Sequence, residues 1–379
     1  MGYEIKTLRE LSLDGKGTYG IAASAVPYSD DLYTYLRITD INDDVNLNKG
    51  SLMSVDDKKA DNYILKKNDI VFARTGASTG RNYFYDELDG TLVYAGFLIK
   101  FSLDPQKINP RFVKYYCQSK YYKEWVYSFN AGSTRGNINA KTFGTLPIPV
   151  FSRDYQNKIV SILDSIDLKI KNNIEINNNL EQQAEALYKE YFAPVDSQRQ
   201  NIKTLDIFCD IFTGKKNSNA STPNGKFKFF TCSPEPLQID SFIFDGNAII
   251  VSGNGAYTGR TRFYSGKFDL YQRTYACTLK DGFISDYIFP LYWFVKLELS
   301  KKIMGGTRGS AIPYIVMNDL AKFEFEFDQN KFESYMPLFK SITETIQTNE
   351  NQNEALAQLR ESLLPHLMSG ELDVSDIDF

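Results

Sequence analysis

Histidine is nearly absent from this chain of 379 residues, which contains only His366. One histidine cannot form a His-Glu-x-x-His zinc site, and it cannot supply a histidine-based catalytic centre at more than one place. The four cysteines, Cys117, Cys209, Cys232 and Cys277, are scattered without a Cys-x-x-Cys spacing. We therefore expect neither a zinc site nor a disulfide framework, but free thiols in a reducing compartment.

Long apolar runs are also missing. The run from Phe283 to Val295 is among the longest, and Ser285, Asp286 and Pro290 interrupt it before it reaches the roughly 18 residues of a membrane helix. No basic, apolar leader opens the chain, so we expect a cytoplasmic protein. With 42% hydrophobic and 14% aromatic residues, the composition suffices for the cores of two domains.

The net charge of −4 is small and unevenly distributed. Residues 1–150 contain 19 basic and 17 acidic side chains, and residues 194–330 contain 16 and 14. Residues 151–193 contain five basic and seven acidic side chains, and residues 331–379 contain three and nine. Two mildly basic regions thus alternate with two acidic ones, which permits local positive surfaces on the basic regions.

A tandem repeat organises the chain. Gly76–Arg81 reads Gly-Ala-Ser-Thr-Gly-Arg, and Gly255–Arg260 reads Gly-Ala-Tyr-Thr-Gly-Arg, 179 positions later. Further along, Gly132–Gly136 matches Gly305–Gly309, and the apolar positions that follow match at a shift of 177. Because internal repeats decide the architecture, we expect each half to form the same module. A duplicated module is more typical of a two-part recognition surface than of a catalytic centre.

Each module is followed by a segment whose apolar residues lie mostly three and four positions apart, which predicts an amphipathic helix. The first segment, 151–193, has no Gly or Pro from residue 154 onward, and its helix would be roughly 60 Å long. In the second, 331–370, Pro337 and Pro365 mark limits or a kink. We expect the two helices to pair as a coiled coil. The alternative is that each packs only on its own module.

The modules themselves are expected to have a mixed α/β (α+β) fold. Short β-rich runs such as 69–73 and 98–101 precede a helical pattern over 110–128, and the second half repeats this order. The sequence therefore predicts two tandem modules that are separated and connected by two long antiparallel coiled-coil helices. This arrangement would be pseudo-twofold symmetric.

No catalytic or cofactor motif accompanies these modules. The glycine-rich Ser252–Gly259 is neither a dinucleotide fingerprint nor a Walker loop, and Gly214-Lys215-Lys216 lacks the upstream glycine of a Walker loop. We interpret the first as a strand followed by a tight turn, and we predict no catalytic site, metal or cofactor. A fused methyltransferase or nuclease would need an Asn/Asp-Pro-Pro-Tyr/Phe segment or an equivalent cluster, and the chain has no two adjacent prolines.

Three segments are the most distinctive: Asn68–Gly76, Leu146–Pro149 followed by Gln156, and Leu363–Leu372 at the end of the second long helix. Together with the order of the parts, they make the chain resemble the specificity subunits of type I restriction-modification systems. The likeness extends over nearly the whole chain. One departure is Lys322–Phe327, where an alternating acidic strand replaces the Leu-Pro-Ile-Pro exit of the first module and puts the path into the second helix in doubt.

The resemblance implies a division into target-recognition domain 1 (1–150), spacer helix 1 (151–193), target-recognition domain 2 (194–330), spacer helix 2 (331–370) and a C-terminal tail (371–379). It further implies a subunit that is not itself an enzyme and that recognises a bipartite target in double-stranded DNA. Its partners would be two methyltransferase subunits and, with them, restriction subunits. These partners, and not this chain, would carry S-adenosylmethionine and ATP. The alternative is a coiled-coil scaffold whose modules bind peptides.

Arginines beside Gly, Ser and Thr in predicted loops could contact phosphate or guanine, and short neighbours let backbone amides approach phosphates. Equally, Thr-Gly-Arg could be a turn whose arginine pairs with a carboxylate. Residues present in both halves should serve the scaffold or phosphates, whereas bases should be read where the copies differ. The predicted DNA-binding residues are Arg74, Ser78, Thr79, Arg81, Asn82, Tyr83, Arg135, Asn137, Asn139, Asn254, Tyr257, Thr258, Arg260, Arg262, Arg308 and Ser310.

Among these, the predicted base readers are Asn82, Tyr83, Asn137 and Asn139 in the first module, and Asn254, Tyr257, Arg262 and Ser310 in the second. A separate prediction concerns the contact between the long helices. There, Leu163, Ile166, Ile170 and Leu187 are expected to face, in that order, Leu363, Ile346, Ile342 and Phe339.

Overall fold

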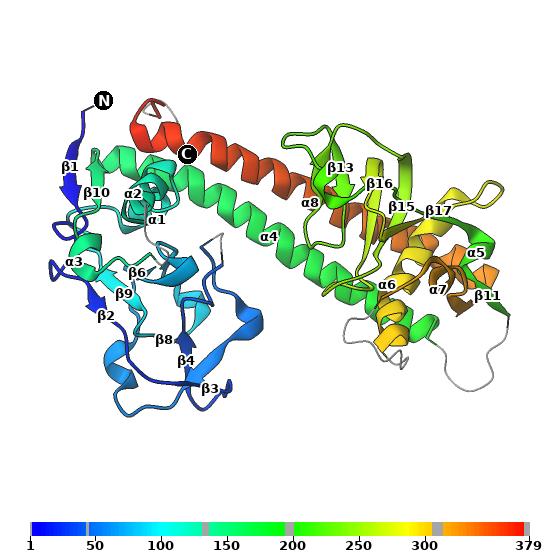
Figure 1. Ribbon diagram of the computed structural model, residues 1–379, viewed down its shortest axis with the longest axis horizontal. Coiled ribbons are helices and arrows are strands. Elements are labelled where there is room, and N and C mark those ends of the chain that lie inside the picture. Colours follow the sequence, from blue (N-terminus) through cyan, green and yellow to red (C-terminus); the bar gives the residue numbers. More distant parts are fainter. Residues whose placement is uncertain (1, 43–44, 131–135, 194–200, 305–313, 375–379) are drawn as a thin grey trace. The chain divides into compact units, whose positions relative to one another are not determined.

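The computed structural model describes residues 2–42, 45–130, 136–193, 201–304 and 314–374 (Figure 1). The chain divides into two compact units. The first unit is formed by Met1–Lys169 with Ala355–Phe379, and the second by Ile170–Glu354. Each unit therefore contains one module together with part of each long helix.

The first module begins and ends in a two-stranded pairing and contains two four-stranded sheets. Its strands are β1 (Glu4–Thr7), β2 (Thr18–Tyr19), β3 (Ala25–Val26), β4 (Tyr33–Leu36), β5 (Met53–Val55), β6 (Asp69–Ala73), β7 (Asn82–Phe84), β8 (Leu92–Tyr94), β9 (Leu98–Ser102) and β10 (Pro147–Val150). Its helices are α1 (Pro110–Tyr116), α2 (Lys120–Asn130) and α3 (Ala140–Phe143). The sheet orders are β2-β9-β6-β7 and β3-β5-β4-β8.

The second module contains one six-stranded sheet, in the order β12-β17-β15-β16-β13-β14, and a separate pair of strands. Its strands are β11 (Ile202–Thr204), β12 (Cys209–Thr213), β13 (Phe227–Phe230), β14 (Leu237–Ile239), β15 (Phe244–Ser252), β16 (Thr261–Leu270), β17 (Thr274–Leu279) and β18 (Glu324–Glu326). Its helices are α5 (Leu205–Phe208), α6 (Ile288–Met304) and α7 (Met317–Ala321).

The two sheets share a central arrangement that follows the sequence repeat. In the first, Ile70 of β6 lies opposite Phe84 and Phe101; in the second, Ile249 of β15 lies opposite Phe263 and Cys277. β16 is continuous where the first module has β7, an intervening turn and β8. The shorter connection explains why the offset between equivalent residues falls from 179 before it to 176 after it.

An entry strand and an exit strand pair in each module. β1 pairs with β10, and Glu4 lies opposite Val150; β11 pairs with β18, and Ile202 lies opposite Glu326. The acidic exit segment of the second module thus forms the same kind of strand as the Leu-Pro-Ile-Pro segment of the first. In β18 the alternation places Phe325 in the core, while the glutamates on either side are exposed. The path into the second helix is therefore like the path into the first.

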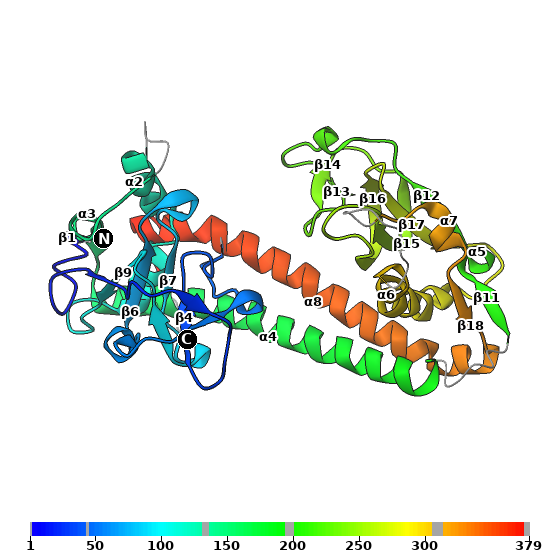
Figure 2. The same cartoon turned by 60° about the horizontal axis from the view of Figure 1, so that its bottom comes forward.

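The long helices are α4 (Arg153–Tyr191) and α8 (Gln329–Ser369), and they lie side by side (Figure 2). In the first unit Ile159 and Leu163 of α4 share a buried cluster with Leu367 of α8. In the second unit Ala184 of α4 shares a buried cluster with Phe339 of α8. Both clusters also contain residues of the local module, so the helices pack on each other and on the modules.

Of the two roles predicted for Pro337 and Pro365, the role as limits of the second long helix is wrong. Pro337 and Pro365 lie inside α8 and do not end it. Each proline removes one backbone donor, a cost that packing can offset. Around Pro337 that packing is plain, because Phe332 and Phe339 are both fully buried in the core of the second unit.

The predicted register between the helices is also only partly right. Leu163 and Leu363 belong to one hydrophobic cluster, and Leu187 and Phe339 to another. However, Ile166 does not face Ile346, nor Ile170 Ile342. The Asn177 side chain donates to the Ile346 carbonyl at 3.3 Å instead.

The reason for the register is polar. The buried Asn173 side chain donates to Gln352 and to Asn353, both at 2.8 Å, and Asn349 donates to Asn177 at 2.8 Å. A hydrophobic period alone cannot reveal a seam of amides, because it treats these positions as solvent-facing. Buried amides accept few alternative pairings, which gives them a strong influence on register.

Candidate nucleic-acid interface

The repeated hexapeptide forms the same turn in both modules. Gly76 and Gly80 have φ values of 74° and 90°, and Gly255 and Gly259 have φ values of 84° and 85°. In the first turn the Thr79 hydroxyl donates to the Gly76 carbonyl at 2.7 Å; the second turn has the same bond, at 2.8 Å, from threonine to glycine. Positive φ is the conformation in which glycine avoids the cost that a side chain would bring. The repetition of these residues thus has a backbone cause.

Each turn is closed by a matching pair of backbone hydrogen bonds. In the first module Ala73 N–H donates to the Arg81 carbonyl at 2.8 Å, and Gly80 N–H donates to the Ala73 carbonyl at 2.9 Å. In the second module Ser252 and Arg260 are joined in the same way at 3.0 Å. The arginine therefore leaves the turn at an equivalent point in each module.

The residues after the second repeated motif lie against this turn. The N–H of Ile138 donates to the Arg74 carbonyl at 2.9 Å, and the N–H of Ile315 donates to the Gly253 carbonyl at 2.8 Å. In the first module the Thr79 hydroxyl also lies 3.1 Å from the Gly136 carbonyl. Two segments far apart in sequence are thus joined into one loop cluster in each module.

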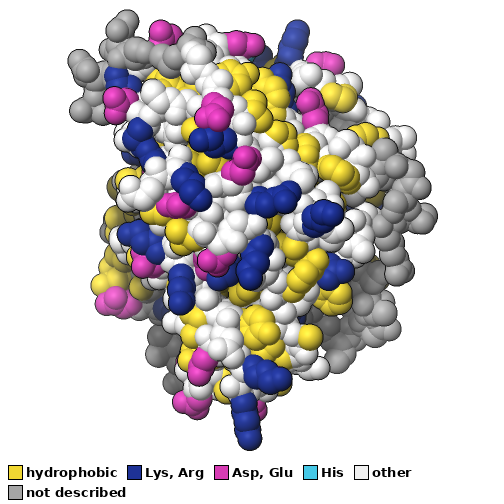
Figure 3. All heavy atoms as spheres, turned by 90° about the vertical axis from the view of Figure 1, so that its left-hand side faces the viewer, with side chains coloured by type: hydrophobic (Ala, Val, Ile, Leu, Met, Phe, Trp, Pro, Cys, Tyr) yellow, Lys and Arg dark blue, Asp and Glu magenta, His cyan; other side chains and the backbone are white. Residues whose placement is uncertain are grey.

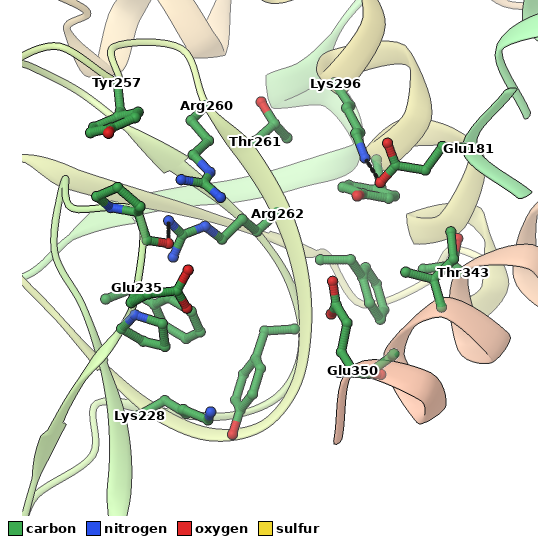
Figure 4. Close-up of a pocket in the computed structure, with 18 of the residues that line it drawn as sticks. Glu181, Lys228, Glu235, Tyr257, Arg260, Thr261, Arg262, Lys296, Thr343 and Glu350 are labelled. Carbon is green, nitrogen blue, oxygen red and sulfur yellow. Dashed lines mark hydrogen bonds and ion pairs between the residues drawn. The ribbon is translucent and has the colours of Figure 1, made fainter. Parts of the chain in front are cut away.

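In the second unit this turn borders a cleft of about 830 Å³ (Figure 4). Arg260 and Arg262 lie close together on one side, with Tyr257 beside them. Across the cleft, α6 contributes Lys296 and α8 contributes Glu350. The arginines and aromatic rings on one wall could contact an anionic, stacked ligand.

The cations of this cleft differ in how fully they are engaged. Arg262 donates to the carbonyls of Ser233 and Pro234, and burial, together with the neighbouring Arg260, lowers its pKa. Lys296 forms an ion pair with Glu181 at 2.6 Å. By contrast, Arg260 is exposed, and its guanidinium lies 5.7 Å from the centre of the Tyr257 ring. Arg260 is therefore the cation of this wall that is best placed to meet a ligand.

Basic side chains do not form one uninterrupted patch on the face drawn in Figure 3. They are scattered among acidic and hydrophobic side chains over that face. Among the described residues, no group of three His, Cys, Asp or Glu side chains is placed to hold a metal ion. The described helices include none that is both long and apolar enough to cross a membrane. The four cysteines are free thiols, as predicted, and Cys117, Cys209 and Cys277 are buried.

Comparison with known proteins identifies the family. The family model of the type I restriction modification DNA specificity domain matches residues 3–182 and 199–355. The chain belongs to this family. The two matched segments take up most of the chain and correspond to its two repeats.

Named relatives agree with this assignment. The chain is 32% identical over 180 residues to the type I restriction enzyme EcoDI specificity subunit of Escherichia coli, a match that covers 45% of this chain and 38% of that protein. It is 22% identical over 302 residues to the MjaIX specificity subunit of Methanocaldococcus jannaschii, covering 70% of each. The chain thus matches well under half of the first relative and about two thirds of the second.

A solved structure shares the fold. The S subunit of a type I restriction-modification system from M. genitalium superposes with a TM-score of 0.62, covering 99% of this chain and 97% of that one. The identity is 14%. At this identity the likeness shows the fold alone, which in this chain is a mixed α/β fold.

Two of the base readers predicted in the first module are wrong, because their side chains are buried. Asn82 is 2% exposed, and its amide donates to the Cys117 carbonyl at 3.0 Å. Tyr83 is 3% exposed, and its hydroxyl donates to Asp89 at 2.7 Å. Both residues lie in β7, directly after the turn, where their side chains point into the protein. Both side chains are thus buried and already hydrogen-bonded within the protein.

Other predicted residues serve the turn or a helix end. The side chain of Asn139 accepts from the N–H of Thr142 at 2.9 Å and so caps α3. The hydroxyls of Thr79 and Thr258 bond within their own turns. Ser78 lies in the first turn, and its carbonyl accepts from the Arg81 N–H at 2.9 Å. These residues position the loop cluster.

The remaining predicted residues lie in or beside the loop clusters. Arg81 is half-buried and donates to the Ile41 carbonyl at 3.3 Å, whereas Asn137 is exposed opposite Thr75. Asn254 is half-buried in the equivalent pairing of the second module. The structure therefore brings Arg74, Arg81 and Asn137 together in one module, and Asn254, Tyr257, Arg260 and Arg262 in the other. Arg135, Arg308 and Ser310 lie outside the described residues.

Three surface residues of the loop clusters were missed by sequence reasoning. Tyr19 and Phe97 are 42% and 59% exposed, and Arg273 is exposed in the other module. A residue-by-residue comparison of the two halves at the shift of 176 would have paired Phe97 with Arg273. The repeated turns give a shift of 179, which does not apply after the shorter connection in β16.

Changing Gly80 to alanine is expected to destabilise the first unit by about 2–4 kcal/mol, through backbone strain and overpacking. An added Cβ would lie 2.5 Å from Val126 Cγ1, and φ is positive. The control is Gly76→Ala, where φ is also positive but no atom lies within 4 Å, so we expect a loss of only about 1 kcal/mol. Urea unfolding measures both, and equal losses would contradict the packing argument.

Proposed function

We propose that this protein is the DNA sequence-specificity subunit of a type I restriction-modification complex. Its two modules would each read one half of a bipartite target in double-stranded DNA. The observation that carries this proposal is the duplicated turn, which presents an arginine at the same point of each module while neighbouring side chains differ between the copies. Equal backbones with unequal side chains suit two readers of different half-sites.

The proposed division of labour leaves chemistry to the partners. Target-recognition domains occupy residues 1–150 and 194–330, and spacer helices occupy 151–193 and 331–370, ahead of a tail at 371–379. The helices would form an antiparallel coiled coil that relates the two halves by a pseudo-twofold axis. The subunit itself would be non-catalytic and cytoplasmic, and it would direct methyltransferase and restriction subunits to the target.

The partner proposal is two methyltransferase subunits per chain, docked on the outer surfaces of α4 and α8, with restriction subunits added to them. Exposed carboxylates such as Glu175 and Glu361 are available on these surfaces. Docking on acidic surfaces should weaken as salt screens the charges. Co-purification followed by native mass measurement should show two methyltransferase chains. The double variant Glu175→Lys, Glu361→Lys should weaken the complex. If this variant forms the same complex as the wild type at every salt concentration, the proposed docking surface is wrong.

The function is tested by sequencing the methylome of a host with and without this gene. A bipartite methylated motif should disappear when the gene is removed. The alternative, a non-catalytic coiled-coil scaffold whose modules bind peptides, expects no such motif. It also expects no specific DNA affinity after reconstitution with methyltransferase subunits.

Arg81→Ala and Arg260→Ala test phosphate contacts at equivalent positions of the two turns. If each arginine binds a phosphate, each variant should bind all duplexes more weakly, and the slope of log K against log salt should fall by about one contact. Preference for the cognate sequence should persist. The measurement is a salt titration with cognate and scrambled duplexes. A loss confined to cognate DNA would assign the arginine to base readout instead.

A further inference from the structure

The repeat identifies positions that share a backbone but not a side chain. Arg74 N–H donates to the Phe97 carbonyl at 3.0 Å, and Gly253 N–H donates to the Arg273 carbonyl at 2.8 Å. The carbonyls of Arg74 and Gly253 also accept equivalent bonds from the segment after the second motif. Arg74 therefore corresponds to Gly253, and Phe97 corresponds to Arg273.

The turn that carries Phe97 and Arg273 is itself conserved between the copies. It connects β8 to β9 in the first module and β16 to β17 in the second (Figure 1). Leu98 N–H donates to the Ala95 carbonyl at 2.8 Å, and Thr274 N–H donates to the Tyr271 carbonyl at 2.9 Å. The backbone at this place is thus the same, and only the side chain at its tip differs.

In the first module these positions form a cationic and aromatic surface. The Arg74 guanidinium lies 5.1 Å from the centre of the Tyr19 ring, and Phe97 is 59% exposed at the tip of the turn. The Nε of Arg74 is buried and has no hydrogen-bond partner among the described residues. Because its side chain is exposed, Phe97 contributes little to the hydrophobic core. Aromatic rings and arginine side chains at the surface can contact bases.

In the second module the same place is chemically different. Gly253 removes the cation that Arg74 supplies, and Arg273 puts an exposed one where Phe97 lies in the first. The glycines after Tyr19 and Thr213 are equivalent, because each packs against a backbone carbonyl. A Cβ added to Gly20 would lie 2.2 Å from Tyr94 O, and one added to Gly214 would lie 1.7 Å from Leu270 O. A threonine thus takes the place of the tyrosine. Both modules keep the frame and exchange the exposed groups.

We propose that the turn tips at Phe97 and Arg273 are specificity-determining positions, each reading one half-site. Phe97, with Arg74 beside it, contacts bases of the half-site read by the first module. Arg273 contacts bases of the other half-site as a hydrogen-bond donor, for which guanine is the best acceptor. This inference rests on the proposed function and adds residues to it that the repeated motifs do not include.

The test uses the full chain reconstituted with methyltransferase subunits and a library of DNA targets randomised in both half-sites. Phe97→Ala should relax preference in one half-site, and Arg273→Ala in the other, each by about 5- to 150-fold at the affected position. The controls are Leu88→Ala, which removes a side chain that is 76% exposed in the first module, and Lys322→Ala, which removes an exposed cation in the second. Both controls should retain the wild-type preference.

The outcomes separate this inference from the function on which it rests. If the wild-type complex shows no preferred sequence, the proposed function itself is wrong. If the wild type is specific and both variants keep each half-site preference within twofold, the turn tips do not read bases. If a variant binds cognate and scrambled DNA more weakly by the same factor, its residue contacts the DNA backbone, and the inference is again overturned. Thermal melting checks that each variant is folded. The carbonyls of Phe97 and Arg273 accept the bonds from Arg74, Gly253 and Cys232, and both alanine variants keep these carbonyls.

Discussion

A heptad inserted into both long helices is expected to change the gap between the two proposed half-sites, while each half-site keeps its sequence. Seven residues add about 10 Å to a helix and are close to two full turns, so the packing face shifts by only about 20°. About three base-pair steps of 3.4 Å span the same distance. Methylation at the original target should fall on the order of 100-fold or more, because one half-site loses several base contacts at once.

The insertion must be made in both helices because their side chains interlock. The insertion in α4 belongs within 165–180, and its counterpart belongs in the α8 segment that lies against it. Asn173 and Asn177 of α4 bond to Gln352, Asn353 and Asn349 of α8, so lengthening one helix alone would break these amide contacts. The matched control is Ile176→Asn, which alters a 44% exposed side chain in the same stretch without changing its length.

Methylation of a randomised target library gives both the half-sites and the gap. The control should retain the original gap. Altered half-sites with an unchanged gap would mean that helix length does not set the spacing.

Asp167→Asn is expected to destabilise the first unit by about 2–3 kcal/mol, near the lower end for a partly buried charge network. The carboxylate of Asp167 on α4 accepts from Tyr115 at 2.9 Å and forms ion pairs with Lys114 at 3.2 Å and with Arg360 at 3.0 Å. The module, α4 and α8 therefore meet at one side chain. The amide would leave both cations without their counter-charge. The control is Glu361→Gln, which neutralises an exposed carboxylate beside Arg360 in α8.

The same network predicts a pH dependence. Burial acts to raise the pKa of Asp167, but Lys114 and Arg360 outweigh it, and the pKa lies below its ordinary value. A lowered pKa in the folded state means that the stabilisation is present above the ordinary value of about 4 and is lost as the pH falls through the folded pKa. Urea unfolding should therefore show a large difference between wild type and Asp167→Asn at pH 7 and a smaller one in acid. A difference that stays constant with pH would contradict this explanation.

Most of the architecture follows from patterns that a sequence can express. The Gly76–Arg81 repeat requires the same positive-φ turn twice, and glycine records that requirement directly. The long helices follow from apolar spacing, because their buried stripes are local and periodic. The family segments and the exit strand could also be located, although the acidic β18 was harder to recognise than its counterpart β10.

The candidate site was harder to predict because exposure depends on the fold. Asn82 and Tyr83 are polar residues beside an exposed turn, yet β7 carries both into the interior, where Cys117 and Asp89 satisfy them. Phe97 shows the opposite error, since a phenylalanine in an apolar run reads as core and in fact lies at a turn tip. Residue type alone does not predict the exposure of these side chains.

The duplication, the two repeated turns, the long helices and the lack of His or Cys metal motifs could all be recognised in the amino-acid sequence. These features depend on local conformation and on spacing along the chain. The register of the helices, which amides such as Asn173 fix, and the correspondence of Phe97 with Arg273 became clear from the three-dimensional fold. Both depend on which distant segments come together, and that is set by packing and hydrogen bonding among residues far apart in the sequence.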